Sequence, residues 1–431
     1  IMECSNKERQ NRLIGCCKSR MDLSYRCFVV CILCISIFLS GPTKTDASAT
    51  WMWLGAASLG AASVGRDTIP DGSLGHQTAT QAPPINSILV DPETLCQRFP
   101  GLTVEQRRVC SSTPEIINMI SEGAKVGIIE CQRQFSTERW NCSVIGDVNN
   151  PFGEVMNTGN KETAFIYAIT SAGVVYAVTR SCSLGNLTEC GCATPRGQPS
   201  DDVVDDDEEW KWGGCTDDVD YGIKLARKFV DSGDKYSSSS SLSSPSPPPS
   251  ALSRPLTIKP GVQEMNLHNN EAGRQLIKSG MKTLCRCHGV SASCSLKTCW
   301  KAMPSFKEIG DLAKSRYSEG VEVVVRTKKQ IRLRRKDRRV RREVIASDEL
   351  VYMQRSPNYC RTNREIGIVG TTGRECNRTS TGSDSCDLLC CGRGYNTQVI
   401  RRVERCDCKF IWCCKVKCRV CETVTDIYTC K

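Results

Sequence analysis

Four cysteines surround a loop of small residues between Cys285 and Trp300, and this stretch has the clearest potential for chemistry in the 431-residue chain. Its sequence is Cys-Arg-Cys-His-Gly-Val-Ser-Ala-Ser-Cys-Ser-Leu-Lys-Thr-Cys-Trp. A bridge from Cys285 to Cys287 is disfavoured, because an extended Cys-x-Cys holds its two Cα atoms near the upper limit for a disulfide. Of the two other connectivities, the nested one fits a single hairpin register better than the crossed one. It joins Cys285 to Cys299 and Cys287 to Cys294.

The nested bridges predict a loop from His288 to Ser293 with Ser291 near its middle. In one interpretation the serine hydroxyl bonds only to the backbone, as is common in small serine-rich turns. In the other, the loop displays its small residues, with Ser291 near the middle, to a partner. Catalysis is poorly supported, since His288 would have to activate Ser291 on a constrained loop without an orienting acid. We therefore expect a protein that is not an enzyme.

The 30 cysteines indicate the compartment in which the chain folds. Six of them lie in the first 34 residues, around an apolar run at 27–39 that is too short to span a bilayer. This run is typical of a signal-peptide core, so residues 1–49 are expected to be a leader. Its removal leaves 24 cysteines, an even number that predicts up to twelve disulfides in a secreted protein.

A zinc-bound fold is the alternative for a cysteine-rich chain. Only Cys418 and Cys421 have the usual spacing of a zinc-ligand pair, and the chain has just three histidines, His76, His268 and His288. We therefore expect no metal site. The secretory compartment also excludes nucleic acid as a partner, despite the formal charge of +11.

Helical patterns position the cysteine loop within a predicted N-terminal domain at 88–320. Thr113-Pro114-Glu115 provides an N-cap, a first-turn proline and an acid, and the helical spacing that follows continues to about Phe135. A second helix is expected from Asn160 to about Cys182, with a stripe of alanines that permits close helix packing. Shorter helices are expected at 222–230 and from Met265 onward.

Three segments are expected to lack a packed fold of their own. Residues 50–87, which include the Ala/Gly-rich run 51–64, are predicted to be a disordered lead-in, and 237–260 is a Ser/Pro-rich insertion. Seven of the nine residues at 201–209 are acidic. We interpret this block as a solvated loop, with docking on the basic run at 326–342 as the alternative.

The sequence changes character after the cysteine loop. Two strands, 321–325 and 349–353, are expected to flank a long exposed basic loop within a segment at 321–353. Residues 354–431 then form a predicted second domain in which twelve cysteines lie between Cys360 and Cys430. At this density disulfides take over the role of a hydrophobic core, and the alternating sequence favours bridged β-hairpins.

The 285–300 loop is similar to the signature loop of the Wnt family of secreted signalling proteins. It departs from that family at Ala292, where glycine is usual, and the change would cost about 1 kcal/mol of strain if this position required a positive φ. Further segments resemble Wnt sequences in the same order, so that the resemblance spans about 88–431: Glu122–Cys142, Glu162–Cys192, Trp210–Cys215, His268–Arg274, Cys386–Gly394 and Cys406–Cys418. The expected fold is therefore α+β, with a helical N-terminal domain that bears a disulfide-bridged acyl-loop hairpin and a small cysteine-rich β-hairpin C-terminal domain.

The resemblance also implies a function. Ser291 would carry an O-linked monounsaturated fatty acyl group, attached by a membrane-bound acyltransferase, and no cofactor would be needed. A Wnt carrier would accompany secretion, and the ligand would bring together the cysteine-rich domain of a Frizzled receptor and an LDL-receptor-related co-receptor. A second Frizzled contact is implied at the tip of the last hairpin, at Phe410, Ile411, Trp412 and Val416. The alternative for these side chains is packing on neighbouring disulfides.

Eleven Lys and Arg residues and one acid lie between Arg326 and Arg342, so most of the positive charge is a single patch. It has three interpretations: a solvated loop, a convertase site at Arg338–Arg342, or a heparan sulfate site, which suits a secreted protein best. The predicted heparan sulfate residues are Lys328, Lys329, Arg332, Arg334, Arg335, Lys336, Arg338, Arg339, Arg341 and Arg342. Three sequons predict N-glycosylation at Asn141, Asn186 and Asn377.

Together these features predict a secreted, lipid-modified Wnt-type ligand that acts in development and cell-fate control. We expect it in the extracellular space and matrix, associated with membranes through its lipid. The alternative is a disulfide-rich, heparin-binding growth factor without an acyl group.

Overall fold

A computed structural model describes residues 50–63, 96, 102–144, 151–153, 155–193, 210–240, 261–294, 297–327, 331–363 and 366–431. The predicted signal-peptide core at 27–39 and the acidic block at 201–209 lie outside these ranges. Of the Ser/Pro-rich insertion, only 237–240 are described, and they continue a helix.

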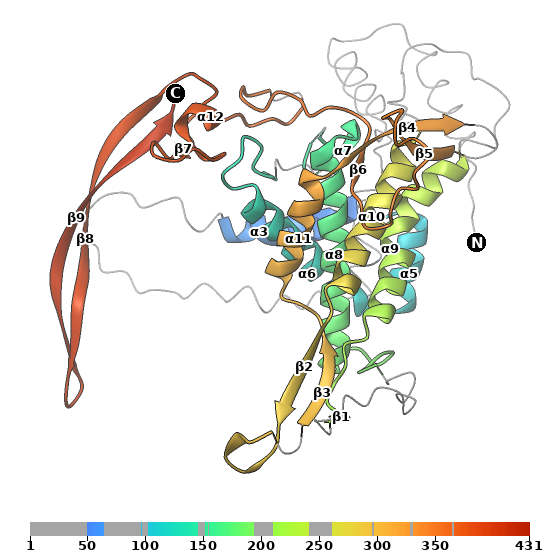
Figure 1. The fold of residues 1–431 in the computed structure, drawn as a ribbon, viewed down its shortest axis with the longest axis horizontal. Helices are drawn as coiled ribbons and strands as arrows, with labels where there is room; N and C mark the ends of the chain where they lie inside the picture. The colour runs from blue at the N-terminus through green and yellow to red at the C-terminus, as the bar shows by residue number, and fades with distance from the viewer. Residues whose placement is uncertain are drawn as a thin grey trace, which may run out of the picture. The chain divides into compact units, whose positions relative to one another are not determined.

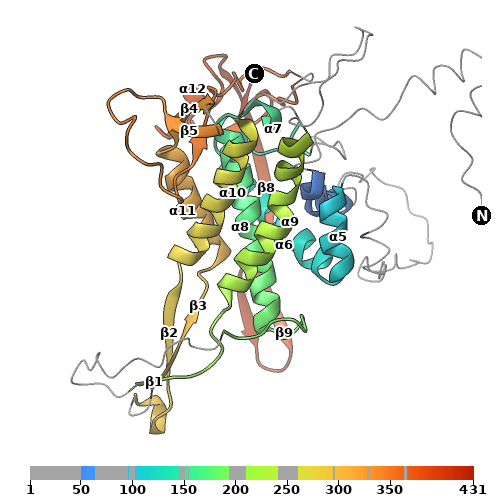
Figure 2. The ribbon, with the colours of Figure 1, turned by 90° about the vertical axis from the view of Figure 1, so that its right-hand side faces the viewer.

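Five long helices form the core, and α8 (Lys161–Ser183) lies at its centre. Helices α6, α9, α10 and α11 pack around it (Figures 1 and 2). Helix α8 is long and apolar enough to cross a membrane by composition, but 94% of its apolar window is buried inside the protein. It is therefore a core helix that contacts protein on all sides. The surrounding helices span Ile116–Gln134 (α6), Val219–Ser240 (α9), Val262–Ser279 (α10) and Phe306–Ser318 (α11).

The predicted small-residue packing of α8 brings helix backbones into direct contact. A Cβ on Gly123 of α6 would lie 2.6 Å from the carbonyl oxygen of Gly173 in α8. On another face, Gly273 of α10 packs against the backbone of Ala168. Neither helix pair could approach this closely with a larger residue at these glycines.

A short N-terminal helix departs from the sequence prediction. Residues 50–63, expected to be part of a disordered lead-in, form a 3₁₀ turn η1 (Thr50–Met52) and helix α3 (Trp53–Ser63), which packs on α6. Trp51 is fully buried, and its ring meets the edge of Phe229 at 6.3 Å between centroids. The pattern of an Ala/Gly-rich apolar run does not distinguish a helix from a disordered segment. Here the run is helical because it packs against α6.

The remaining helices agree with the sequence in part. Helix α8 begins after Asn160 as predicted, and the Asn160 side chain caps it by accepting a hydrogen bond from the Thr163 amide at 2.8 Å. The predicted cap at Thr113 is wrong, since α6 begins at Ile116 and the Thr113 hydroxyl donates to Glu189 at 3.0 Å. Besides α3, the sequence also did not predict α5 (Val104–Ser112), α7 (Val155–Thr158), α11 and the short α12 (Cys386–Leu389).

Three small sheets complete the described fold. The first has the order β1-β3-β2, with β1 (Trp210–Trp212), β2 (Lys282–Cys287) and β3 (Lys297–Ala302). The second has the order β5-β4-β6, with β4 (Val321–Thr327), β5 (Ile331–Arg335) and β6 (Val351–Tyr352). The third, β7-β9-β8, contains β7 (Glu375–Cys376), β8 (Tyr395–Ile411) and β9 (Lys415–Cys430), with helix α12 (Cys386–Leu389) beside it.

Strand β5 corrects the expectation of one long basic loop. It lies inside the basic run and pairs antiparallel with β4, from Val323 opposite Arg335 to Thr327 opposite Ile331. Leu333 packs on a small apolar cluster that includes Val323 and Val351. The alternation of Ile331 and Leu333 with arginines was the available signal for this strand.

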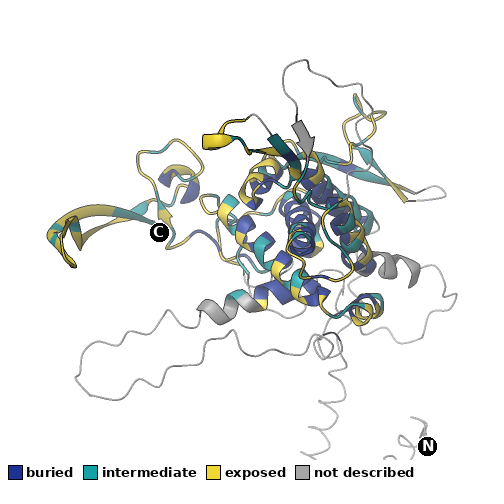
Figure 3. Ribbon diagram, turned by 90° about the horizontal axis from the view of Figure 1, so that it is seen from below, coloured by how far each residue is buried: buried dark blue, intermediate teal, exposed yellow. Residues whose placement is uncertain are grey.

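Eleven disulfides bridge the described chain, six before residue 300 and five after residue 359. Cys413 and Cys414 are not bridged in the structure, and their sulfurs lie 3.5 Å apart. The helices are buried on their inner faces, whereas the β8–β9 ribbon is exposed along most of its length (Figure 3). This ribbon is held at its base by a small core around Cys386, Leu389, Cys390 and Cys430.

Candidate functional site

The acyl-loop hairpin places its four cysteines in two nested bridges, Cys285–Cys299 and Cys287–Cys294. Cys285 lies directly opposite Cys299 in the β2–β3 register, and the second bridge closes the loop beyond the last paired residues. The hairpin projects past the ends of the core helices (Figures 1 and 2). The loop is therefore fixed at its base and accessible at its tip.

The tip holds Ser291 in a left-handed conformation, with φ 56° and ψ 36°. The Gly289 amide donates to the Ser293 carbonyl at 2.8 Å and closes a tight turn around it. Ser291 is exposed, and its neighbour Val290 is 90% exposed. Positive φ falls on Ser291 and not on Ala292, so replacement of the usual glycine by Ala292 adds no strain of this kind.

His288 takes part in the hairpin and not in a catalytic arrangement. Its Nε2 lies 2.6 Å from the Thr298 hydroxyl on β3, across the hairpin. The ring thus connects the two sides of the hairpin below the loop. Ser291 itself is exposed to solvent at the tip of the loop.

The second candidate contact lies at the turn between β8 and β9. Phe410 pairs with Val416 in the ribbon, and Trp412 follows in the turn with 91% of its surface exposed. Phe410, Ile411 and Val416 are 66%, 47% and 59% exposed. These side chains do not pack within their own domain, which disfavours the alternative that they cover neighbouring bridges.

The basic residues divide into two groups. Arg335 and Lys336 form ion pairs with Glu349 at 2.8 Å and Glu322 at 2.5 Å. Arg338, Arg339, Arg341 and Arg342 are exposed on the connection between β5 and β6, and in the described part of the chain no ion pair involves them. Arg332 is exposed and Arg334 half-buried on β5, while Lys328 and Lys329 lie outside the described residues.

The three sequons differ in exposure. Asn186 and Asn377 are exposed, and the Asn377 side-chain oxygen accepts from the Thr379 amide at 3.0 Å. Asn141 is half-buried and accepts from the Ser143 hydroxyl at 2.5 Å.

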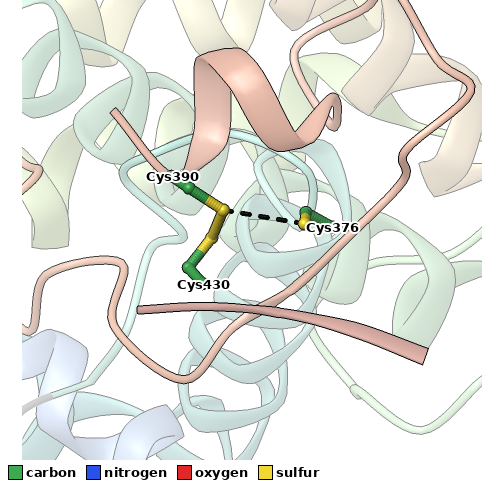
Figure 4. Close-up of side chains that lie close together, drawn as sticks. All are labelled: Cys376, Cys390 and Cys430. Carbon is green, nitrogen blue, oxygen red and sulfur yellow. Dashed lines mark hydrogen bonds between the residues drawn. A yellow bond between two sulfur atoms is a disulfide. The ribbon is translucent and has the colours of Figure 1, made fainter. Parts of the chain in front are cut away.

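Three sulfur atoms meet near the base of the β8–β9 ribbon (Figure 4). The Cys376 sulfur lies 3.6 Å from that of Cys390. Cys390 is bonded to Cys430, and Cys376 to Cys386, so none of these sulfurs is the thiolate that a metal requires. The cluster is therefore a pair of packed disulfides.

An arginine contact that the sequence did not reveal joins the C-terminal region to the helical core. Arg374 donates to the backbone carbonyls of Ser136 at 2.9 Å, Glu138 at 2.6 Å and Arg139 at 2.9 Å. Arg139 in turn donates to the Leu388 carbonyl at 3.1 Å. Arginines that bond to distant backbone leave no local pattern in a sequence.

Comparison with known proteins identifies the chain's relatives. The model of the wnt family matches residues 98–431. Protein Wnt-16 of Mus musculus is 45% identical over 417 residues, covering 93% of this chain and 97% of the mouse protein. The chain belongs to the Wnt family. Protein Wnt-16 of Bos taurus is likewise 45% identical over 390 residues, covering 89% of this chain and 93% of the bovine protein.

A solved structure of human WLS in complex with WNT8A contains a chain that is 34% identical, with a TM-score of 0.49. The match covers 73% of this Wnt and 94% of that chain. Members of the Wnt family are secreted, lipid-modified signalling ligands in development. This Wnt is accordingly a ligand and not an enzyme, and Wnt ligands use no cofactor, since their lipid is covalent.

Proposed function

We propose that this Wnt carries a monounsaturated fatty acyl group on Ser291 and uses it to bind the cysteine-rich domain of a Frizzled receptor. The supporting observation is the display of Ser291 at the exposed tip of a doubly bridged hairpin, with a backbone conformation that turns the loop sharply around it. Ser291 is exposed, so an acyltransferase could reach it.

The acyl group would supply most of the binding free energy. A chain of about sixteen carbons offers on the order of 10 kcal/mol on burial, at about 0.8 kcal/mol per CH₂. The same apolar surface would hold the free ligand on membranes or in complex with a Wnt carrier during secretion. Localisation in the extracellular space and matrix, close to membranes, follows from this chemistry.

The exposed tip of the β8–β9 ribbon is the proposed second Frizzled contact. Trp412 is a large, rigid side chain of the type that dominates interface energetics, and Phe410, Ile411 and Val416 surround it. An LDL-receptor-related co-receptor would complete the signalling complex.

The exposed arginines at 338–342 are the proposed centre of a heparan sulfate site. Within the described residues they form no ion pair, so sulfate groups could bind them without displacing an acid. Arg335 and Lys336 are a weaker part of this prediction, because each would first have to leave an acid.

Mass spectrometry of the peptide that contains Ser291 tests the proposal. Active, secreted protein is expected to carry the acyl adduct there, and Ser291→Ala is expected to abolish Frizzled binding. Ser293→Ala is the matched control, since Ser293 is exposed in the same loop but has extended backbone. An unmodified Ser291 in signalling-competent protein would favour the non-acylated heparin-binding growth factor instead.

A further inference from the structure

We propose that the connection between β5 and β6 is a processing site, at which a paired-basic serine endoprotease of the secretory pathway hydrolyses the Arg342–Glu343 bond. Water adds across this bond. The Arg342 carbonyl carbon receives the hydroxyl and becomes a carboxylate, and the Glu343 nitrogen receives a proton and becomes a new N-terminal amine. No other reactant is needed.

The sequence offers two equivalent recognition motifs, Arg332-Leu333-Arg334-Arg335 and Arg339-Val340-Arg341-Arg342. Each has arginine at its first, third and fourth positions. Proteases with acid-lined pockets select this arrangement, because a guanidinium binds a carboxylate through two parallel hydrogen bonds. The convertase site predicted from sequence at Arg338–Arg342 contains the second motif, and the first motif has the same pattern of arginines.

The structure makes the first motif inaccessible. It lies in β5, where Arg332 to Arg335 pair with β4 through backbone hydrogen bonds. The Arg335 side chain is only 15% exposed and is bound to Glu349. An endoprotease binds its substrate as an additional extended strand, so cleavage here would require β5 to leave its sheet.

The second motif lies on exposed chain. Arg339, Arg341 and Arg342 are exposed, and Val344, just after the proposed cut, is 88% exposed. The backbone hydrogen bonds of this motif are local. The Arg339 amide donates to the Asp337 carboxylate at 2.9 Å, and the Glu343 amide donates to the Val340 carbonyl at 3.0 Å. These hydrogen bonds can break while β5 and β6 stay in place. Proteases cut loops that can unfold locally in this way.

The cut would have an unusual consequence for a protein with so many disulfides. All eleven bridges join cysteines on the same side of residue 342, so no described disulfide links the two products. Noncovalent contacts would still hold them together. Asn269 exchanges two hydrogen bonds with the Val351 backbone at 3.0 and 2.9 Å, and Arg374 binds three carbonyls of the helical core. The product would be a two-chain ligand that separates only on denaturation.

The test is the full chain, tagged at its C-terminus and secreted from cells that contain paired-basic endoproteases. On a denaturing gel without reductant, a fragment with Glu343 at its N-terminus is expected. Arg342→Lys is expected to abolish this fragment while it keeps the loop charge and the fold. Arg332→Lys, in the strand motif, is the matched control and is expected to leave cleavage unchanged.

Three results would overturn the proposal: an uncut wild-type chain, a fragment that begins after Arg335, or equal cleavage of the Arg342→Lys variant. If the secreted wild-type chain is uncut, incubation of the purified native protein with a paired-basic endoprotease shows whether the loop itself resists cleavage. Resistance of native protein in that assay would also refute the assignment. Frizzled binding plays no part in either readout, so the result is independent of the acylation proposal.

Discussion

At Arg274 of α10, polar side chains from three core helices meet. Its side chain is 1% exposed and forms two 3.0 Å hydrogen bonds with Asp231 of α9, while its Nε donates to Glu271 at 2.9 Å. The Ser171 hydroxyl of α8 lies 3.3 Å from the same guanidinium. Such a buried pair is costly to break from one side, because the remaining charge has lost its hydration without a partner.

We predict that Arg274→Met lowers the free energy of unfolding by about 3–5 kcal/mol, since it removes the cation paired with the buried Asp231 carboxylate. Chemical denaturation of the secreted protein measures this loss. Lys278→Met is the control, because Lys278 and Asp220 form an ion pair with both side chains more than half exposed, for which the expected change is below about 1 kcal/mol. Equal effects of the two substitutions would contradict the assigned role of the buried pair.

His268 gives the fold a predicted dependence on pH. Burial lowers the pKa of His268, and the carboxylates of Glu349, Glu271 and Asp348 only partly oppose this shift. Its Nε2 lies 2.9 Å from the Glu349 carbonyl. The unfolded chain therefore binds a proton at a higher pH than the folded one, so stability is greatest above about pH 6.5 and falls on acidification below it.

We predict that His268→Gln reduces the loss of unfolding free energy between pH 7.5 and pH 5.5. Denaturation curves of both proteins at the two pH values provide the measurement. The substitution is expected to lower stability at pH 7.5, where neutral His268 is well packed. A wild-type protein that gains stability on acidification would show that the histidine is protonated when folded.

At the scale of elements, the α6–α8 contact depends on the absence of side chains. Gly123→Ala would place a Cβ 2.6 Å from the backbone of Gly173 and Val174 in α8. We predict a loss of about 1–3 kcal/mol in thermal or chemical unfolding, because the helices must separate. Gly191→Ala is the control, since nothing lies within 4 Å of the added Cβ, and its effect should stay within about 0.5 kcal/mol. A neutral Gly123→Ala would mean that the two helices can separate at little cost.

The ribbon tip gives a second prediction at this scale. Trp412→Ala is expected to weaken Frizzled binding by 2 kcal/mol or more, about thirtyfold, if Trp412 anchors the contact. Val420→Ala is the matched control, because Val420 is 73% exposed on the same ribbon but away from the turn. Surface binding of both variants to an immobilised Frizzled domain makes the comparison. Undiminished binding of Trp412→Ala would remove the tip from the interface.

Elements with their own local pattern could be predicted from the sequence, and elements decided by tertiary contact could not. Helices α6 and α8 follow regular apolar and small-residue spacing, and the nested bridges follow from hairpin register. Helix α3 is apolar on all sides, so only its position against α6 shows that it is ordered. Strand β5 was not predicted, because the many arginines indicated a charged loop although Ile331 and Leu333 alternate with them.

In the candidate site, residue types and spacing predicted the bridged loop, and the resemblance to the Wnt family singled out Ser291 within it. The structure adds the left-handed backbone and the exposure of Ser291. The difference in accessibility between the two arginine motifs depends on the β4–β5 hairpin, because the first motif pairs with β4 and the second does not. Arg374 had no local signal at all, since its three acceptors lie more than two hundred residues earlier in the chain.

For the whole molecule, the proposed function requires two separate contacts on one receptor, the acyl loop and the ribbon tip. Two linked contacts bind more tightly than either alone when both can be engaged at once, and the gain is greatest when their spacing matches that of the two receptor sites. Arg374 contributes to this spacing, because its three charged hydrogen bonds join the base of the ribbon to the end of α6. Loss of these hydrogen bonds should leave each receptor contact intact but reduce the affinity that is gained when both contacts bind at once.

We therefore predict that Arg374→Ala is secreted and acylated but binds the Frizzled domain about tenfold more weakly or worse. Arg401→Ala controls for charge, since Arg401 lies on the ribbon with a side chain that is 75% exposed. The decisive comparison is between the double variant Arg374→Ala/Trp412→Ala and the single variant Trp412→Ala. Once the tip contact is lost, its spacing from the acyl loop no longer matters, so Arg374→Ala should have little further effect on affinity. Fully additive losses would show that Arg374 acts through general stability and not through the spacing of the two contacts.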